Sequence, residues 1–264
     1  MTESNVIPGS IAVRVERLSF RYPGGPDVLT EISFTIAPGE IIGLVGPSGA
    51  GKSTLLQHLN GLLPSQLPDT APRPSGEGTG PGISIDNLPV ARQTIAEVRR
   101  RVGFLFQDPD DQLFCPTVFE DVAFGPLNLG LSDVEVRQRV RDSLASVGLA
   151  GYEPRSTLRL SLGERKRVCL AGVFACQPSL LALDEPFSSL DPRARRTLIA
   201  ILKQFPGSQI IATHDLDVVV DLCDRVLLLD GGQLRAVGMT RDILGNAALM
   251  ERHGLEVPWR LRTT

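Results

Sequence analysis

The segment GPSGAGKST, residues 46–54, constrains the fold of this chain more than any other feature. It follows the apolar run IIGLV and precedes TLLQHLNGLL, which is typical of a helix. Closely spaced glycines let successive backbone N–H groups turn toward one point at a helix N-terminus, which creates a binding place for an anion. The pattern G-x-x-x-x-G-K-[ST] in this setting therefore predicts a strand, a phosphate-binding turn and a helix.

Two side chains at the end of the turn have separate predicted roles. The ammonium of Lys52 is expected to neutralise the β- and γ-phosphate oxygens of a nucleotide, and the hydroxyl of Ser53 is expected to bind magnesium. We expect the whole turn to contact the phosphates, and its residues are Gly46, Pro47, Ser48, Gly49, Ala50, Gly51, Lys52, Ser53 and Thr54.

Short apolar runs separated by helical patterns indicate the rest of the fold. A capping box at Ser132 and Glu135 opens one helix, which Gly148 ends, and Asp191-Pro192 opens another. Strands that alternate with helices predict an α/β fold with a mainly parallel sheet. The four runs that indicate buried strands are EIIGLVG from Glu40, LLALD from Leu180, QIIAT from Gln209 and RVLLLD from Arg225.

The composition narrows the class of protein. A chain of 264 residues with 42% hydrophobic and 22% charged residues fits one large globular domain. The formal net charge of -3 argues against a broad nucleic-acid-binding surface. No apolar run approaches the roughly 20 residues that span a bilayer, and the first residues do not resemble a secretory signal, so a membrane role would depend on a partner. The four cysteines form no CxxC pair and are expected to be reduced thiols.

A pair of acidic residues follows the second apolar run. Asp184 ends the predicted strand LLALD, where its carboxylate is expected to hold magnesium through the water shell of the metal. Glu185 comes next, where it could orient or deprotonate an attacking water. Paired acids at a strand end also occur as helix caps. The independent phosphate-binding turn favours the magnesium interpretation.

In their order along the chain, these motifs resemble those of an ABC-type ATPase subunit. Walker A at Gly46, Walker B at Asp184-Glu185, SSLD ending at Asp191 and THD with His214 occur in that family's order. The resemblance implies that Asp191 takes part in nucleotide binding. It also implies that His214 contacts the γ-phosphate and supports Glu185, although a lone histidine is more often structural.

Two further residues take their expected roles from the resemblance. In the family a glutamine follows the strand after the β subdomain, and Gln107 in VGFLFQDPDD fits that place as a catalytic and magnesium-binding residue. An aromatic residue near the first strand turn stacks on adenine in the family, and Tyr22 in SFRYPGG fits there. Without the family, Tyr22 is explained equally well as a residue of a surface turn.

The stretch LSLGE resembles the family's signature, which reads L-S-G-G-Q or L-S-G-G-E, except that Leu162 replaces the first glycine. The resemblance implies that this turn grips the ATP bound by the opposite subunit through the Ser161 hydroxyl and backbone N–H groups. We expect Leu162 to impair the turn without abolishing its function. A positive φ would strain this leucine, whereas a negative φ would leave it unstrained and able to contact the facing subunit. The retained residues are Leu160, Ser161, Gly163 and Glu164.

The stretch FQDPDDQLFCPTVFEDVAFGPLNLGLS and the ending HGLEVPW are similar to energy-coupling-factor importers, especially the cobalt and nickel branch. This resemblance implies ATP and Mg²⁺ as cofactors and a second ATPase subunit in a homodimer or heterodimer. It also implies a transmembrane coupling subunit and a substrate-binding membrane subunit as partners, with no nucleic acid. Acidic residues in the loop 107–114, among them Asp108, Asp110 and Asp111, could meet basic helices of the coupling subunit, or could simply be solvated.

The family also implies a division of the chain, which we expect to form a single ABC ATPase domain over residues 1–264. Its fold would be α/β, a P-loop NTPase (RecA-like) core with a small antiparallel β subdomain and an α-helical subdomain. We assign 1–106 and 171–240 to the core with its β subdomain, 107–170 to the helical subdomain and 241–264 to a C-terminal extension. The Pro- and Gly-rich residues 64–82 are expected to form a mobile loop.

The sequence therefore predicts an ATP-hydrolysing subunit, peripheral at the cytoplasmic face of the cell membrane, that powers import of cobalt, nickel or a vitamin. One alternative is a soluble ABC ATPase acting in DNA repair or translation, although those proteins usually carry tandem cassettes or coiled-coil insertions. A second alternative is a largely non-hydrolysing subunit of a heterodimeric pair. The presence of Glu185 and His214 speaks against full inactivity but is compatible with a heterodimer.

Overall fold

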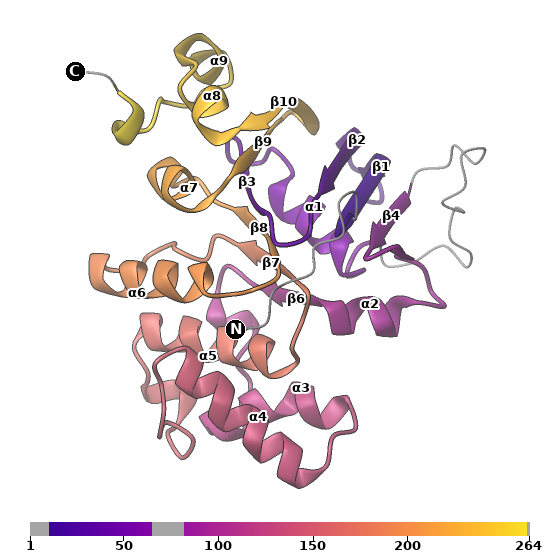
Figure 1. Ribbon diagram of the computed structural model, residues 1–264. Helices are drawn as coiled ribbons and strands as arrows, with labels where there is room; N and C mark the ends of the chain where they lie inside the picture. The colour runs from indigo at the N-terminus through magenta and orange to yellow at the C-terminus, as the bar shows by residue number, and fades with distance from the viewer. Residues whose placement is uncertain (1–10, 65–81, 263–264) are drawn as a thin grey trace.

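The computed structural model of the chain describes residues 11–64 and 82–262, and a six-stranded sheet lies at its centre (Figure 1). The strand order is β10-β9-β3-β8-β7-β6, in which the last five strands are parallel and β10 is antiparallel to β9. The predicted α/β fold with a mainly parallel sheet is confirmed, and the four apolar runs form β3, β7, β8 and β9. The strands are β3 (Ile41–Val45), β6 (Val102–Leu105), β7 (Leu180–Asp184), β8 (Ser208–Ala212), β9 (Arg225–Asp230) and β10 (Gln233–Met239).

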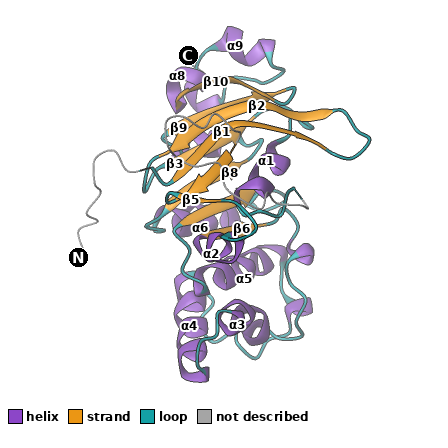
Figure 2. Cartoon of the chain, turned by 90° about the vertical axis from the view of Figure 1, so that its right-hand side faces the viewer, coloured by secondary structure: helices purple, strands orange, loops and turns teal. Residues whose placement is uncertain are grey.

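A second, antiparallel sheet covers one face of the central sheet. Its strand order is β2-β1-β4-β5, and a long β1–β2 hairpin extends to one side of the molecule (Figure 2). This sheet is the expected small β subdomain. Its strands are β1 (Val13–Arg21), β2 (Asp27–Ile36), β4 (Gly82–Ile85) and β5 (Leu88–Pro89).

The central sheet is buried on both faces, which explains why its strands are continuous apolar runs. Successive side chains of a strand point to opposite faces, so β7 contributes Leu181 and Leu183 to one core and Leu180 and Ala182 to another. The second core lies between the central sheet, the antiparallel sheet and α1 (Lys52–Leu59), with α2 (Ile95–Arg101) at its border. The first core is shared with the helices of the opposite face.

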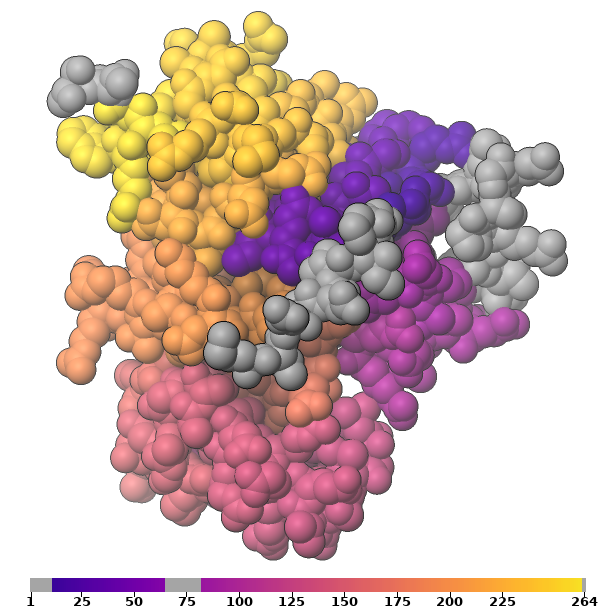
Figure 3. Space-filling model, in the orientation of Figure 1, coloured from indigo at the N-terminus to yellow at the C-terminus, as the bar shows by residue number. Residues whose placement is uncertain are grey.

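A purely helical region forms the lower end of the molecule in Figures 1 and 3. It contains α3 (Val118–Asn128), α4 (Asp133–Ser146) and α5 (Leu162–Ala175). The predicted capping box of Ser132 and Glu135 opens α4, which ends two residues before Gly148. The assigned boundary after residue 170 lies inside α5, because this helix continues to Ala175; the helical region therefore extends about one turn further than the motif-based division.

The remaining helices cover the face of the central sheet opposite α1. They are α6 (Pro192–Lys203), which Asp191 caps, α7 (Leu216–Leu222), α8 (Thr240–Leu244) and α9 (Ala247–Arg252). Short 3₁₀ turns are η1 (Pro109–Asp111), η2 (Thr157–Arg159) and η3 (Trp259–Leu261). Across residues 11–64 and 82–262, no helix has the length and apolar character needed to cross a membrane. The expected mobile loop falls almost entirely on residues 65–81, outside the described residues.

The helical region should depend strongly on the contact between α4 and α5. Leu144 on α4 is fully buried in the core that includes α5, whereas Val134 on the same helix is 77% exposed. We expect Leu144→Ala to lower the free energy of unfolding by about 2–5 kcal/mol, because it removes buried methyl groups and leaves a cavity. Val134→Ala is the matched control and should change that energy by less than about 0.5 kcal/mol. Urea unfolding of both variants measures the difference, and equal losses would contradict this packing.

Candidate functional site

The register of the parallel strands brings the predicted site residues to one edge of the central sheet. Ala212 at the end of β8 is paired with Leu44 of β3 and with Asp184 of β7. Leu183 of β7 is in turn paired with Leu105 of β6. The segments that follow these four strands therefore emerge side by side, as ligand-binding segments do in open α/β sheets. They are the phosphate-binding turn, Gln107, Asp184 with Glu185, and Thr213 with His214.

Glycine is strongly favoured at both ends of the phosphate-binding turn. Gly46 has φ 153°, and a Cβ atom there would lie 1.9 Å from the carbonyl oxygen of Leu229. Gly51 has φ 102° and directly precedes α1, and its Cβ would lie 3.0 Å from the carbonyl oxygen of Val28. Both positions combine left-handed backbone with close approach of another strand, so a side chain is excluded at Gly46 and strained at Gly51.

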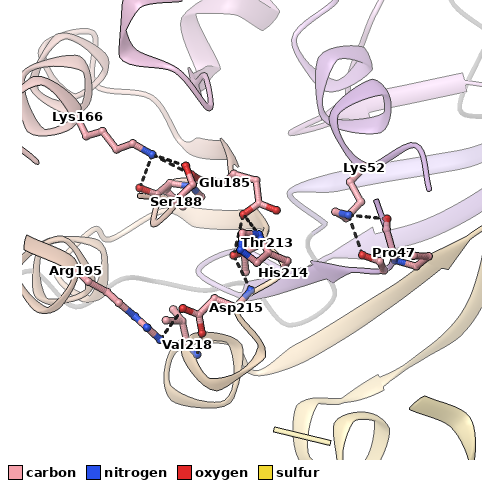
Figure 4. A network of polar contacts seen from close by, with 12 residues as sticks. Pro47, Lys52, Lys166, Glu185, Ser188, Arg195, Thr213, His214, Asp215 and Val218 are labelled. Carbon is pink, nitrogen blue, oxygen red and sulfur yellow. Dashed lines mark hydrogen bonds and ion pairs between the residues drawn. The ribbon is translucent and has the colours of Figure 1, made fainter. Parts of the chain in front are cut away.

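The ammonium of Lys52 forms hydrogen bonds with the backbone of the phosphate-binding turn. Its Nζ donates hydrogen bonds to the carbonyl oxygens of Gly46, at 2.8 Å, and Pro47, at 2.9 Å (Figure 4). Burial lowers the pKa of Lys52, while the carboxylates of Glu185 and Asp184 oppose that change. The Lys52 ammonium is therefore close enough to both carboxylates to be stabilised by their charge.

Asp184 is a buried carboxylate with properties that suit a cation ligand. It is only 7% exposed, and its Oδ1 atom is buried without a hydrogen-bond partner among the described residues. Burial raises the pKa of Asp184, and a hydrogen bond from the Ser53 side chain opposes this. A buried carboxylate oxygen without a donor is costly unless a metal, a water or a proton satisfies it. The hydroxyl of Ser53 and the carboxylate of Asp184 are oxygen ligands of the kind that Mg²⁺ prefers, so these residues fit that ion.

Glu185 is held in a single orientation at the end of β7. Its Oε2 accepts a hydrogen bond from Thr213 Oγ1 at 3.2 Å and lies 2.9 Å from His214 Nδ1 (Figure 4). The Glu185 side chain is 13% exposed and that of His214 is 73% exposed, so the histidine is the more accessible member of the pair. No role was predicted for Thr213. Its position directly before His214 in the THD motif could have indicated that it also lies near Glu185.

The structure places Gln107 and Tyr22 at the periphery of this group. Gln107 is exposed and lies in the bend after β6, at the same edge of the sheet as Asp184. Tyr22 follows β1, and its hydroxyl lies 3.3 Å from Thr54 Oγ1 of the phosphate-binding turn. Tyr22 is 41% exposed, and its ring contacts Phe20 edge-on. Its proximity to the turn is compatible with stacking on a base, which stays a prediction.

The backbone at Leu162 does not carry the strain that a positive φ would cause. Ser161 is the N-cap of α5, and its hydroxyl and Glu164 form a capping box in which Glu164 N–H donates to Ser161 Oγ at 3.3 Å. Leu162 is the first residue of α5 and does not have a positive φ. Of the two alternatives for Leu162, the structure has the unstrained one, because a helical φ at the first position of α5 accepts any L-residue. The spacing S-x-x-E at 161–164 was the signal for this helix start.

Gly163, by contrast, is required by packing. A Cβ atom at this position would lie 2.9 Å from the Cβ of Ala194 in α6. Asp191 caps α6 by accepting the N–H groups of Arg193 and Ala194 at 2.8 and 2.9 Å, and these hydrogen bonds lower its pKa. Ser161, Gly163 and Asp191 thus line one surface hollow of about 390 Å³ between the starts of the two helices. No residue of 46–54 lines this hollow, so the two predicted halves of the nucleotide site do not meet within one chain.

Comparison with known proteins gives a consistent result over most of the chain. Residues 29–188 match the family model described as ABC transporter. A relative from Geobacter sulfurreducens, assigned to the ABC transporter ATP-binding proteins, is 49% identical over 246 residues, which cover 93% of this chain and 94% of the relative. The energy-coupling factor transporter ATP-binding protein EcfA of Methanothermobacter thermautotrophicus is 41% identical over 249 residues, covering 93% of this chain and 76% of that protein.

The fold agrees with a solved structure of the same kind. A CbiO subunit from Clostridium perfringens, described as part of the ABC transporter complex cbiONQ, superimposes with a TM-score of 0.77 at 34% identity. The match covers 92% of this chain and 94% of the solved chain. The predicted P-loop NTPase core, antiparallel subdomain and helical region are confirmed by this agreement. The chain therefore belongs to the ABC transporter family, and within it to the ATPase subunits that resemble the energy-coupling-factor type.

Proposed function

We propose that this chain binds ATP with Mg²⁺ and hydrolyses it to power an energy-coupling-factor importer. The observation that carries the proposal is the arrangement of Glu185, whose carboxylate is oriented by Thr213 and His214 beside the unsatisfied oxygen of Asp184. A carboxylate fixed in this way can accept a proton from a water that attacks the γ-phosphate. His214, 2.9 Å from the Glu185 carboxylate and largely exposed, would contact the γ-phosphate and stabilise the charge that develops there.

The other site residues bind and neutralise the nucleotide. The backbone N–H groups of the turn 46–54 and the N-terminus of α1 face the phosphates, and Lys52 exchanges its two carbonyl contacts for phosphate oxygens. Ser53 and Asp184 would hold the magnesium ion, with Gln107 reaching it from the end of β6. Bound magnesium supplies charge neutralisation at the β- and γ-phosphates. Tyr22 is the candidate for stacking on adenine.

A second ATPase subunit completes each nucleotide site in this proposal. The hollow lined by Ser161, Gly163 and Asp191 is the surface that would close on the ATP of the facing subunit. The separation of this hollow from the turn 46–54 within one chain supports a head-to-tail dimer. Leu162 lies half-buried at the edge of the same hollow, where it could contact the facing subunit. The same head-to-tail arrangement would serve a homodimer or a heterodimer.

A membrane partner would dock on the loop 107–114 and the adjoining helix α3. Asp111 is exposed in η1, while Asp110 forms an ion pair with Arg165 of α5. Phe114 is 64% exposed and packs edge-on against the 49% exposed Phe124, with ring centroids 4.8 Å apart. Acidic and aromatic groups together suit a coupling helix that presents basic and apolar residues. Through this contact the chain would lie peripherally at the cytoplasmic face of the membrane.

Cobalt or nickel is the proposed cargo, with a vitamin as the other possibility. The similarity to a CbiO subunit and to EcfA proteins supports an importer of this type rather than an ATPase of DNA repair or translation. Cargo passes through the substrate-binding membrane subunit, so the residues of this chain do not select it. Uptake assays with Co²⁺, Ni²⁺ and a labelled B vitamin, offered separately to cells with the complete complex, identify the cargo.

Glu185→Gln should abolish turnover while preserving ATP binding. The amide keeps the shape of the side chain but cannot accept a proton from water, so single-turnover hydrolysis should fall at least about a hundredfold. Glu251→Gln, an exposed change on α9, is the matched control and should retain the parent rate. Nucleotide affinity is measured in parallel with a fluorescent ATP analogue. A Glu185→Gln rate within a few-fold of the parent would exclude this residue as the base.

Leu162→Gly and Gly163→Ala should have opposite outcomes, although both change the signature turn. Leu162 has no positive φ to relieve, so glycine there should leave turnover within roughly threefold and cost the start of α5 at most about 1 kcal/mol. Gly163→Ala forces α5 away from Ala194 and should lower turnover about tenfold or more. Steady-state ATPase assays with the membrane partner present compare the two. A large rate increase in Leu162→Gly would restore the interpretation of an impaired turn.

Asp111→Lys should weaken assembly with the transmembrane coupling subunit without changing ATP affinity. It reverses an exposed charge and leaves the Asp110–Arg165 ion pair intact. Against basic helices we expect roughly a tenfold loss of affinity. Glu251→Lys, on the opposite end of the molecule, is the control for net charge. A pull-down from membranes that contain the coupling subunit measures complex formation, and an undiminished complex in Asp111→Lys would remove this loop as the docking site.

A further inference from the structure

Lys166 is a buried lysine that none of the predicted motif roles uses. It lies on α5, is 2% exposed, and shares a helix face with the buried residues Cys169 and Leu170. Burial lowers its pKa, and the nearby Glu185 carboxylate opposes that effect. A lysine is rarely buried unless hydrogen bonds satisfy its ammonium group.

The Lys166 ammonium has three acceptors, all in the segment that follows β7. Nζ donates to the carbonyl oxygens of Glu185 and Pro186, each at 3.1 Å, and to Ser188 Oγ at 3.0 Å (Figure 4). These acceptors lie 19 to 22 residues along the chain from Lys166. The contact therefore joins the helix that begins at the signature turn to the backbone of the proposed catalytic glutamate.

The backbone of Glu185 requires such support. Its φ is 45°, in the left-handed region that non-glycine residues seldom adopt and that persists only where the surroundings enforce it. Its N–H donates to the carbonyl oxygen of Ala212 at 2.8 Å. Its carbonyl oxygen accepts from Lys166 Nζ at 3.1 Å and from Ser188 Oγ at 2.9 Å. The peptide groups on both sides of the residue are thus fixed, on one side by β8 and on the other by Lys166 and Ser188.

The direction of the Glu185 side chain follows from this backbone. With the left-handed conformation, the carboxylate reaches Thr213 Oγ1 and His214 Nδ1. A return of Glu185 to a negative φ would redirect its Cα–Cβ bond and move the carboxylate away from both groups. A displacement of about 1 Å in a reacting group can cost two orders of magnitude in rate.

The chain also uses lysine sparingly. Its 27 basic residues are almost all arginine, and lysine stands only at positions 52, 166 and 203. Three acceptors that surround one point suit the compact ammonium of lysine, whereas the planar guanidinium of arginine would not fit them. Lysine is therefore used at 166 for its shape as well as for its charge.

We propose that Lys166 is a positioning residue for ATP hydrolysis, whose ammonium holds Glu185 in the left-handed conformation that aims its carboxylate at the attacking water. The inference rests on the proposed catalytic role of Glu185. Because Ser161 caps the same helix five residues earlier, any shift of α5 at the signature turn also reaches the Glu185 backbone through Lys166.

The test compares Lys166→Met and Lys166→Gln in the full-length chain. Methionine keeps the length of the side chain but donates no hydrogen bond, so kcat for ATP hydrolysis should fall about tenfold or more while the Kd for ATP stays within about twofold. Glutamine restores an N–H donor at a similar place and should recover part of the lost kcat. Lys203→Met, an exposed lysine at the end of α6, is the matched control and should behave as the parent does.

Parent and Glu185→Gln are assayed beside these variants, together with urea unfolding of each protein. A parent without hydrolysis would overturn the proposed function, whereas an active parent with an inactive Glu185→Gln and a fully active Lys166→Met would overturn only the role of Lys166. Equal losses of kcat and ATP affinity in Lys166→Met, with no recovery in Lys166→Gln, would show a general structural role and also overturn it. If Lys166→Met does not fold, Ser188→Ala takes its place: it removes one support of the Glu185 carbonyl and should lower kcat several-fold, and an unchanged kcat would refute the proposal.

Discussion

The candidate site depends on the register of four parallel strands, because each strand places one functional segment at the same edge of the sheet. The pairing of Ala212 with both Leu44 and Asp184 aligns β3, β8 and β7. A slip of one residue between β7 and β8 would move Glu185 by about 3.3 Å along the strand, beyond hydrogen-bond reach of Thr213. The hydrogen bond from Glu185 N–H to the Ala212 carbonyl continues this alignment past the end of the strands. Backbone pairing therefore determines the chemistry at this edge.

Close approach of a neighbouring element explains why some glycines of the motifs are required and one is replaceable. Gly46 meets the Leu229 carbonyl and Gly163 meets Ala194, so a side chain at either position would displace a neighbouring element. Leu162 stands where the first turn of α5 is open at the surface, and a helical φ accepts any L-residue there. The same signature thus contains one position limited by packing and one that is not. A consensus sequence does not distinguish these two reasons for glycine.

Helix α5 contacts three of the parts of the molecule for which a role is proposed. Its first turn, capped by Ser161, lies in the hollow that includes Asp191. Arg165 pairs with Asp110 of the candidate docking loop, and Lys166 reaches the backbone of Glu185. These contacts join the docking surface, the signature turn and the acidic pair through one rigid element. Helix α5 has 14 residues and packs against α3 and α4. A movement at one end of this helix would therefore displace its other end as well.

The sequence by itself determined the features whose physical cause is local. The phosphate-binding turn, the four buried strands and the caps at Ser132 and Asp191 follow from backbone preferences and hydrogen bonds within a few residues. The start of α5 at Ser161 also has a local cause, the capping box of Ser161 and Glu164. The resemblance to the signature had instead suggested a turn that needs a flexible glycine. What only the tertiary structure decided involves residues far apart in the chain. Lys166 meets Glu185 across 19 residues, and Thr213 meets Glu185 across 28. Such contacts form only when the strands have paired and both faces of the sheet are covered. Strand register, and not local propensity, sets the positions of these groups.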